Sequence, residues 1–390
     1  MRDEASRRGA SGVPERRSAR RPLPSGTPVV LKVGSSALTL PSGGLDPGGV
    51  AGVAEEVAGM WEAGYPTVLV TSGAVAAGFP VLGLERRPND LAWLQVSAAV
   101  GQGLLMQRYA DELAARGRVV GQVLLTKEVL GNREQYLNAR RALELMLRAD
   151  VVPVVNENDT VAVEELRWGD NDRLAALVSH LVGAGLLVIL TDTAGLLSRD
   201  PRLDEEAELL QAVQHTDEVL DRLARAGPGP LGSGGMATKV AAVRMAAWSG
   251  IPTVIAQARI PGVVARAVAG EEVGTWVEPR AGRRLPARKL WIAFGQPAEG
   301  GLVIDQGAVE ALTKSGRSLL PAGITEVRGE FGAGVAVEVW GPEDRELVAK
   351  GLVRVSAAEL RPLLGRRTAE VAKAGWGGEV IHRDDLVLLR

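Results

Sequence analysis

Two lysines of this sequence stand in glycine-rich segments whose composition suits phosphate binding. Lys32 opens Lys-Val-Gly-Ser-Ser directly after an apolar run, and Lys239 closes Gly-Ser-Gly-Gly-Met-Ala-Thr-Lys directly before a helical run. Only 7 of the 45 basic residues are lysines, so a lysine kept in such a loop is hard to ascribe to chance. Small residues let backbone N–H groups approach an anion, and a lysine adds a compact positive charge.

Two further turns of small residues follow apolar runs, Thr-Ser-Gly-Ala-Val-Ala-Ala-Gly at 71–78 and Thr-Asp-Thr-Ala-Gly-Leu at 191–196. One glycine turn at a strand end is a plain turn more often than a phosphate site. Several such turns in one parallel sheet favour a phosphorylated ligand. The spacing of a Walker A loop and the position of a Rossmann fingerprint are both absent, so neither motif explains these glycines.

Carboxylates and amides gather in two short clusters, Asn156-Glu157-Asn158-Asp159 after an apolar run and Gly169-Asp170-Asn171-Asp172 shortly beyond it. Either cluster alone has an ordinary interpretation as a turn or a helix cap. Like charges so close together repel unless a cation or a zwitterion compensates them. Next to phosphate loops, the two clusters predict a Mg²⁺ site or an amino-acid site.

The composition excludes several kinds of chemistry. The chain has no cysteine, which excludes disulfides, thiol nucleophiles and iron–sulfur clusters, and only His180, His215 and His382, each interpreted as structural or surface residues. The net charge of −2 predicts no general attraction to nucleic acid or to an anionic membrane. No apolar run reaches the ~20 residues of a membrane span, so we expect a cytoplasmic protein without a membrane partner.

The elements that must position these side chains alternate along the chain. From residue 28 to 277, short apolar runs alternate with helical periodicity, which predicts an α/β domain with a parallel sheet. Residues 1–27 carry seven arginines without apolar periodicity and are expected to be a disordered basic tail. The Pro, Gly and charge of 278–287 indicate a linker, and 288–390 reads as a small β-rich domain.

An ordered set of motifs resembles the glutamate 5-kinases of the amino acid kinase superfamily, from residue 28 to the C-terminus. The motifs, in chain order, are Lys32–Ser36, Val70–Gly78, Ala98–Gln102, Tyr136–Arg140, Val155–Asp159, Gly169–Asp172 and Gly234–Lys239.

The resemblance implies an α/β/α sandwich with a mainly parallel sheet, followed by a C-terminal PUA domain. It implies transfer of the γ-phosphoryl group of ATP to the side-chain carboxylate of L-glutamate, which gives L-glutamyl 5-phosphate in the first step of proline biosynthesis. Lys32, Lys239 and Asp172 would be catalytic, with Asp172 organising the two lysines, and Ser72, Asp159 and Asn171 would hold glutamate. The residues implied for ATP binding are Lys32, Thr191, Asp192, Ser233, Gly234, Gly235, Met236, Ala237, Thr238 and Lys239.

The expected ligands are ATP and a Mg²⁺ ion held mainly by the nucleotide phosphates, so no protein metal ligand is assigned. The family resemblance also implies a homo-oligomer inhibited by proline. Residues 288–390 carry 14 basic and 14 acidic residues, a balance that argues against RNA as a partner. Two alternatives stay open: a kinase of the same superfamily with another acceptor, and an RNA-binding PUA protein with an inert kinase site.

Overall fold

The computed structural model of the chain describes residues 20–126, 129, 132–161, 171–199, 204, 206–224, 235–280, 285–342, 346–366 and 378–389. The larger part of the described chain is built around an eight-stranded sheet with the order β3-β4-β2-β1-β5-β7-β8-β6. The strands in that order are β3 (Val119–Leu125), β4 (Val151–Glu157), β2 (Thr67–Val70), β1 (Val29–Val33), β5 (Leu186–Thr191), β7 (Thr253–Gln257), β8 (Thr275–Glu278) and β6 (Ala212–Gln214).

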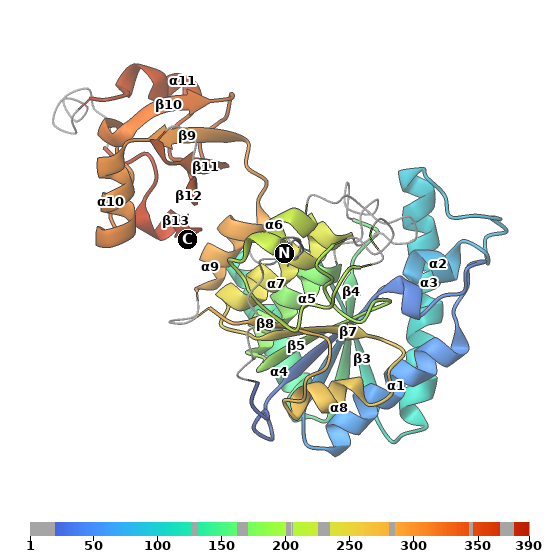
Figure 1. Cartoon of the computed structure of the whole chain (residues 1–390). Coiled ribbons are helices and arrows are strands. Elements are labelled where there is room, and N and C mark those ends of the chain that lie inside the picture. The colour runs from blue at the N-terminus through green and yellow to red at the C-terminus, as the bar shows by residue number, and fades with distance from the viewer. Residues whose placement is uncertain are drawn as a thin grey trace, which may run out of the picture.

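Helices cover both faces of this sheet, as Figure 1 shows. On one side α1 (Pro47–Glu62) packs against α3 (Leu91–Ala114) and α8 (Val263–Val268), and α2 (Ala74–Gly78) packs against α3. On the other side α5 (Asn171–Val182) packs against α4 (Arg133–Arg148) and α7 (Met236–Trp248), and α6 (Glu218–Ala224) packs against α7. The predicted α/β/α sandwich is therefore confirmed.

Local sequence explains why these elements begin where they do. All five residues of β1 are buried, and all of them except Lys32 are apolar, as expected for a strand covered on both faces. Asp46 caps α1 by accepting a hydrogen bond from the Gly48 N–H, and Pro47 occupies the first helical position. Asp90 caps α3 in the same way through the N–H of Trp93.

Six of the strands run parallel, so their carboxyl ends lie at one edge of the sheet. β1 pairs in parallel with β2 on one side and with β5 on the other, which makes β1 the point where the strand order reverses. Ligands of open α/β sheets bind at such a point. The antiparallel pairing of β7 with β8 was not predicted from the sequence.

The predicted tail ends at residue 27, and the structure describes it from residue 20 onward. These last residues of the tail pack on the larger domain. The Arg20 guanidinium donates hydrogen bonds to the carbonyls of Glu271 (2.8 Å) and Val273 (2.7 Å), and the Leu23 N–H donates to the Val268 carbonyl (2.9 Å). The sequence did not predict this packing, because the partners lie far away in the chain. Residues 1–19 lie outside the described residues.

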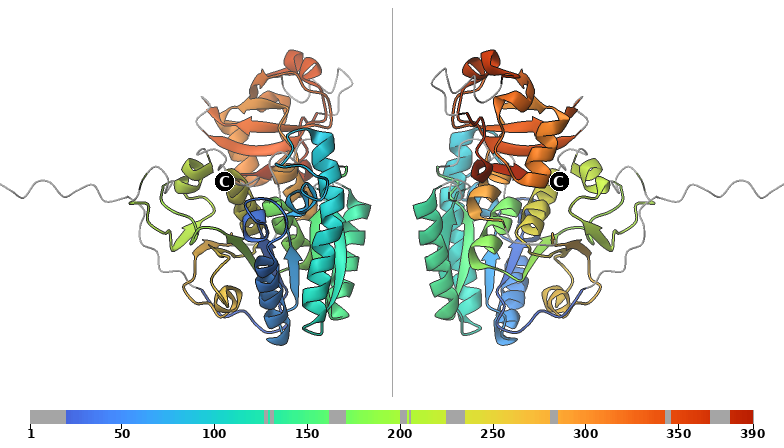
Figure 2. Two further views of the ribbon diagram at one scale, coloured as in Figure 1. Left: turned by 90° about the vertical axis from the view of Figure 1, so that its right-hand side faces the viewer. Right: turned by 90° about the vertical axis from the view of Figure 1, so that its left-hand side faces the viewer.

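The C-terminal part forms a second sheet of five strands, ordered β10-β9-β11-β12-β13. Its elements are β9 (Gly300–Ile304), α10 (Gln306–Ser315), β10 (Ile324–Arg328), β11 (Ala336–Trp340), β12 (Leu347–Leu352), α11 (Ala357–Leu360) and β13 (Leu386–Leu388). This sheet has its own apolar core, which includes Leu302, Val337 and Val348. The predicted β-rich domain is therefore confirmed, and both views of Figure 2 place it at one end of the larger domain.

A separate apolar cluster joins the two domains. Trp248, the last residue of α7, packs with Leu290 and Ile292 and with Leu352 of β12. Leu290 ends α9 (Ala287–Leu290), which continues into a single π-helical turn, Trp291–Gly295. Short 3-10 turns complete the described chain: Ser35–Ala37, Pro321–Gly323, Arg361–Leu363 and Arg383–Asp385. Among the described helices, none has both the length and the apolar character needed to cross a membrane.

Candidate active site

A buried carboxylate lies between two lysines at the carboxyl edge of the large sheet. Lys32 Nζ lies 2.6 Å from Asp172 Oδ1, and Lys239 Nζ lies 3.3 Å from Asp172 Oδ2. Thr238 Oγ1 also donates a hydrogen bond to Asp172 Oδ2 (2.9 Å). The Asp172 side chain is fully buried, and the side chains of Lys32 and Lys239 are 5% and 12% exposed. The structure therefore brings together the three residues predicted to be catalytic.

The electrostatics of this cluster keep Asp172 ionised. Burial alone would raise the pKa of Asp172, but the charges of Lys32 and Lys239 and the hydrogen bond from Thr238 outweigh it. The pKa of Asp172 is thus held well below its usual range. One carboxylate shared by two ammonium groups leaves a net positive charge, so the cluster can attract a phosphate group.

Three different elements deliver these side chains. Lys32 is the fourth residue of β1, Asp172 lies in the first turn of α5, and Thr238 and Lys239 lie in the first turn of α7. The N-terminus of a helix carries a partial positive charge and backbone N–H groups without partners inside the helix. Two helix N-termini and two lysines therefore converge at the edge where the strand order reverses.

Directly beside Asp172, the Asn171 side chain lies at the centre of a buried amide network. Asn171 Nδ2 lies within hydrogen-bond distance of the Thr71 carbonyl (3.0 Å), Ser72 Oγ (2.9 Å) and Asn156 Oδ1 (3.0 Å). Asn156 Nδ2 in turn donates to Gln102 Oε1 on α3 (2.8 Å). The structure brings together Ser72 and Asn171, two of the three residues predicted to hold glutamate.

The third predicted residue, Asp159, follows β4 and makes no hydrogen bond or ion pair with the described residues. Burial raises the pKa of Asp159 to about 6, and the positive charge of Arg87 opposes this shift in part. A partly buried carboxylate without a hydrogen-bonded partner among the described residues can bind a cationic ligand group at neutral pH, where it is ionised.

The described residues predicted to bind ATP lie at the end of β5 and at the start of α7, apart from Lys32 in β1. Thr191 ends β5, and its hydroxyl donates to the carboxylate of Asp192 (3.0 Å). Gly235 is the N-cap of α7, and Met236 and Ala237 open that helix beside Thr238. Ser233 and Gly234 lie outside the described residues, as do Gly169 and Asp170.

Comparison with known proteins agrees with this geometry. The model of the amino acid kinase family matches residues 27–257, and the model of the PUA domain matches residues 300–374. The chain is 48% identical over 366 residues to a glutamate 5-kinase of Frankia casuarinae, covering 93% of this chain and 96% of the relative. The chain belongs to the glutamate 5-kinase family.

Other members of this family align over nearly their whole length. The glutamate 5-kinase of Streptomyces avermitilis is 46% identical over 377 residues, which cover 96% of this chain and 99% of the relative. That of Trichlorobacter lovleyi is 44% identical over 364 residues, which cover 93% of this chain and 96% of the relative. The match therefore includes both domains of the family.

The three histidines lie in structural positions in this family member. His180 lies near Tyr136 with ring centroids 6.1 Å apart, and His215 contacts Trp248 edge-on at 6.2 Å. His382 accepts a hydrogen bond from the Asp384 N–H through Nδ1 and so caps a 3-10 turn. None of these contacts involves the lysine cluster.

The residues that the structure describes do not form a Mg²⁺ site built from protein side chains alone. No three His, Cys, Asp or Glu side chains gather there in a way that could hold a metal ion. Both oxygens of the buried Asp172 contact ammonium groups, so this carboxylate does not fit as a metal ligand.

The sequence predicts no individual contact for Gln102, Asn156 or Thr71, although Asn156 stands in one of the two polar clusters. Gln102 and Asn156 stand in motifs that carried the family resemblance, but nothing in their spacing shows that they contact one another. Thr71 was seen only as part of a small-residue turn. In the structure the Thr71 hydroxyl lies 3.1 Å from the hydroxyl of the fully buried Tyr109. This contact holds the start of the turn at 71–78 against the interior of the domain. Only the fold reveals these contacts.

Proposed function

We propose that this protein transfers the γ-phosphoryl group of ATP to the side-chain carboxylate of L-glutamate, giving ADP and L-glutamyl 5-phosphate. This is the first step of proline biosynthesis. The observation that carries the proposal is the cluster of Lys32, Asp172 and Lys239 directly beside the amide network of Asn171. The similarity to glutamate 5-kinases over 93% of the chain supports the choice of acceptor.

The chemistry requires alignment and charge neutralisation. A glutamate side-chain carboxylate has a pKa of about 4.3, so it is ionised at neutral pH and needs no general base. One of its oxygens attacks the γ-phosphorus, the bond from phosphorus to the β,γ-bridging oxygen breaks, and ADP leaves with that electron pair. Because an anion attacks an anion, stabilisation of negative charge is the main task of the protein.

Lys32 and Lys239 are the groups that perform this task in our proposal. Asp172 fixes the position of both ammonium groups before ATP binds, so little reorganisation is needed in the reaction. The lysines would contact the transferring phosphoryl group and the nucleotide phosphates. Asp172 would act through the lysines without itself touching the substrate.

The two substrates would enter from neighbouring elements. Ser72, Asn171 and Asp159 would hold the amino-acid end of glutamate, since they supply hydroxyl, amide and carboxylate groups, and the first two lie beside the cluster. Thr191, Asp192 and the first turn of α7 would hold ATP. Mg²⁺ would come with the nucleotide, bound by its phosphates and by water, because Mg²⁺ keeps several waters in most protein sites.

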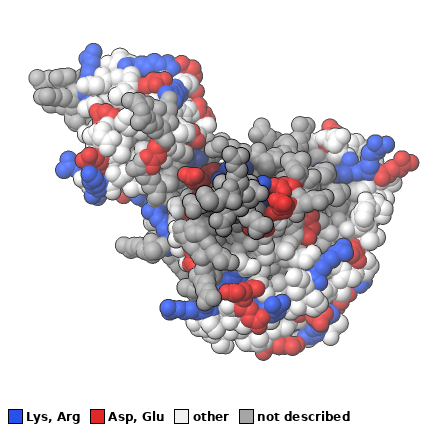
Figure 3. Space-filling view, viewed as in Figure 1, with Lys and Arg blue, Asp and Glu red and all other residues white. Residues whose placement is uncertain are grey.

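Further parts of the proposal rest on the family resemblance and on composition. Proline would inhibit the enzyme, the enzyme would be a homo-oligomer, and it would act in the cytoplasm. The division into a kinase domain at 28–277, a linker at 278–287 and a PUA-like domain at 288–390 is proposed from the two separate sheets and cores. Figure 3 shows acidic and basic side chains intermixed on the visible face of the C-terminal domain, which does not favour RNA as a partner.

An acceptor panel tests the proposal. ADP release is measured with ATP and Mg²⁺ in the presence of glutamate, aspartate, N-acetylglutamate or uridine monophosphate. We expect turnover that depends on glutamate. Turnover with one of the other acceptors alone would show a different kinase of the same superfamily, and tight RNA binding without any turnover would show that the kinase site is inert.

A further inference from the structure

We propose that Gln102 binds the α-carboxylate of the amino-acid substrate through its Nε2 group and so helps to determine substrate specificity. This inference rests on the proposed function, because it assumes an amino acid beside Asn171. It follows from the orientation of three side-chain amides, which backbone groups fix at two points.

The first fixed point is Asn171. Its Nδ2 atom lies 3.0 Å from the carbonyl oxygen of Thr71, which can only accept a hydrogen bond. The amide nitrogen must therefore face Thr71. The other end of the amide, Oδ1, is enclosed and has no hydrogen-bond partner among the described residues. Asn171 Oδ1 is therefore a buried acceptor to which no described residue donates a hydrogen bond.

The second fixed point is Asn156. Its Oδ1 atom accepts a hydrogen bond from the backbone N–H of Glu157 (2.9 Å), which can only donate. Asn156 Nδ2 is then the donor toward Gln102, and the 2.8 Å contact identifies the Gln102 atom that accepts as Oε1. The Gln102 amide nitrogen is consequently the end without a partner. Nε2 is enclosed and unbonded among the described residues.

The network thus ends in one enclosed donor, Gln102 Nε2, and one enclosed acceptor, Asn171 Oδ1. An enclosed polar group without a partner is unfavourable, and such groups in native structures call for an explanation. A ligand that supplies both an acceptor and a donor removes the cost at both ends. An α-amino acid supplies this pair, because its α-carboxylate accepts and its ammonium group donates.

The charges around the network assign the two ends of the amino acid. The ammonium group matches Asn171 Oδ1 and the anionic form of Asp159, while the α-carboxylate matches the uncharged donor Gln102 Nε2. The lysines are not needed for the α-carboxylate, since both contact Asp172 and serve the phosphate groups. The α-carboxylate would therefore be read by Gln102, and a substrate without it would lose this contact.

Two variants of Gln102 test this role. Gln102→Met removes the donor, and Gln102→Glu replaces it with a charged acceptor that repels the α-carboxylate while the other oxygen can still accept from Asn156. We expect kcat/KM for glutamate to fall roughly 10- to 100-fold in the Met variant, the range for losing a hydrogen bond to a charged group, and further in the Glu variant. KM for ATP should change little. The melting temperature should fall in the Met variant, because methionine also removes the oxygen that accepts from Asn156 Nδ2, so kinetics are compared at a temperature where each variant is folded.

The control variants are Gln107→Met and Gln107→Glu on the same helix. Gln107 Nε2 donates to Asp111 Oδ1 at an exposed site (2.8 Å), outside the amide network. The second substrate is 4-aminobutanoate, which keeps the side-chain carboxylate and the ammonium group of glutamate but lacks the α-carboxylate. Its kcat/KM, measured at high enzyme concentration, should be low in the parent enzyme and should hardly change in the Gln102 variants.

The comparison separates a contact from a merely structural role. If the Gln102 variants lose as much activity toward 4-aminobutanoate as toward glutamate, or if Gln102→Glu is no worse than Gln102→Met, Gln102 does not bind the α-carboxylate. Unchanged kinetics with glutamate would overturn the proposal equally. Absence of glutamate turnover in the parent enzyme is a different result, which would overturn the proposed function itself.

Discussion

At the scale of single residues, the account depends on a buried carboxylate that organises two lysines. Removing one partner of a buried ion pair leaves an uncompensated charge, which costs about 3–5 kcal/mol. Asp172 is fully buried and contacts both lysines. It therefore holds the two ammonium groups at the edge of the sheet where a polyphosphate would bind. In our proposal the lysines therefore serve both the stability of the domain and its chemistry.

The first prediction concerns Lys32→Arg and Lys239→Arg. The ammonium of Lys32 is buried and lies 2.6 Å from Asp172, so the longer and planar guanidinium of arginine would have to be displaced from this position. We expect each variant to lower kcat on the order of 10²-fold, as for loss of a well-placed electrostatic donor. KM for glutamate should change little.

Lys314→Arg serves as the control for these variants. Lys314 lies on the exposed side of α10, 3.3 Å from Glu310, and its replacement should leave kcat unchanged. Steady-state kinetics with both substrates and a melting curve are measured for each protein. A Lys32→Arg or Lys239→Arg variant that folds and turns over near the parent rate would show that this lysine has another role.

The second prediction concerns the pH dependence of glutamate binding. Burial raises the pKa of Asp159 to about 6, opposed in part by Arg87, and glutamate itself stays ionised down to about pH 4.3. If ionised Asp159 binds the ammonium group, kcat/KM for glutamate should fall as the pH drops below about 6. Asp159→Asn should lower kcat/KM and remove this limb of the pH profile. The same acid limb in the variant would contradict the role.

The stability of the same variant gives an independent check. A carboxyl group whose pKa is raised on folding favours the folded state at low pH, and that contribution is lost as the pH rises through about 6. Above that pH the carboxylate of Asp159 is ionised and partly removed from water, which costs free energy. Urea unfolding at pH 8 should therefore show that Asp159→Asn is at least as stable as the parent protein. A clear loss of stability at pH 8 would mean that the charge is compensated in the folded state.

At the scale of elements, the position of the loop that carries Ser72 depends on close packing of α2 against α3. A Cβ atom on Gly101 would lie 1.8 Å from the Ala74 carbonyl oxygen, and one on Gly78 would lie 1.9 Å from the Ser97 carbonyl oxygen. Neither helix can approach the other this closely with a side chain at either position. The two glycines thereby place Gln102, the neighbour of Gly101, next to the loop that carries Ser72.

The third prediction follows from this contact. Gly101→Ala should force the helices apart, lower the melting temperature and reduce kcat/KM for glutamate at least tenfold. Gly103→Ala is the matched control two residues along α3, where a Cβ atom meets nothing within 4 Å. That change should stabilise the helix by about 0.5–1 kcal/mol and leave activity intact. Equal behaviour of the two variants would show that the helix contact does not matter.

The sequence predicts the strands better than the contacts between them. β1 and the starts of β2, β4, β5 and β7 follow from buried apolar runs that end in turn residues, because burial on both faces leaves a clear pattern. The three-residue β6 has a single buried residue and so shows no such run, and the four-residue β8 runs antiparallel to β7. Pattern alone therefore finds the six parallel strands, including most of β3 at one edge, and misses β8 and β6 at the other edge.

The candidate site shows the same limit. Glycine-rich segments next to a lysine point to Lys32 at the end of a strand and to Lys239 at the start of a helix, since few other roles need those residue types there. Asn156 and Gln102 lie 54 positions apart, and their hydrogen bond depends on how α3 packs against the sheet. Which end of an amide faces the substrate depends on backbone partners that only the folded chain provides.

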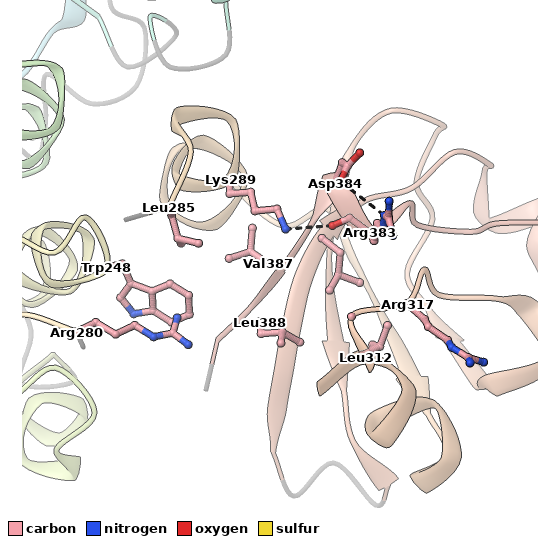
Figure 4. A pocket seen from close by; sticks show the side chains of 12 residues that line it. Trp248, Arg280, Leu285, Lys289, Leu312, Arg317, Arg383, Asp384, Val387 and Leu388 are labelled. Carbon is pink, nitrogen blue, oxygen red and sulfur yellow. Dashed lines mark hydrogen bonds and ion pairs between the residues drawn. The ribbon is translucent and has the colours of Figure 1, made fainter. Parts of the chain in front are cut away.

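At the scale of the whole molecule, the two domains meet around Trp248, at the opposite end of α7 from Lys239. Arg280 lies over the Trp248 ring at 4.0 Å, and Phe294 packs edge-on against it at 6.2 Å. Figure 4 shows Trp248 and Arg280 facing the C-terminal domain across a cavity of about 240 Å³. The buried Lys350 of β12 donates hydrogen bonds to the carbonyls of Ala293 and Gln296, which ties the C-terminal sheet to the turn after α9.

The fourth prediction concerns a shortened protein that ends at Glu278. All site residues proposed here precede that point, so glutamate-dependent activity should persist with kcat within a few-fold of the parent value. The melting temperature should fall, because Trp248 loses the apolar cover of Leu290 and Ile292. A shortened protein ending at Gly295 keeps part of this cover and should melt at a higher temperature than the one ending at Glu278.

These two proteins also test whether the C-terminal domain belongs to the site. Folding is checked by circular dichroism before kinetics are compared at a temperature where both proteins are folded. A folded protein ending at Glu278 without any activity would show that the C-terminal domain completes the active site, contrary to our assignment of all catalytic groups to the kinase domain.

The most direct test of the account is to trap the product with hydroxylamine, which converts an acyl phosphate into a stable hydroxamate. We expect glutamyl hydroxamate in amounts equal to ADP when ATP, Mg²⁺ and glutamate are supplied. Aspartate is one methylene shorter, so its carboxylate would be out of line with the γ-phosphorus, and a misplacement of about 1 Å costs on the order of 10²-fold. ADP formation from glutamate without hydroxamate, or comparable kcat/KM for aspartate, would contradict the account.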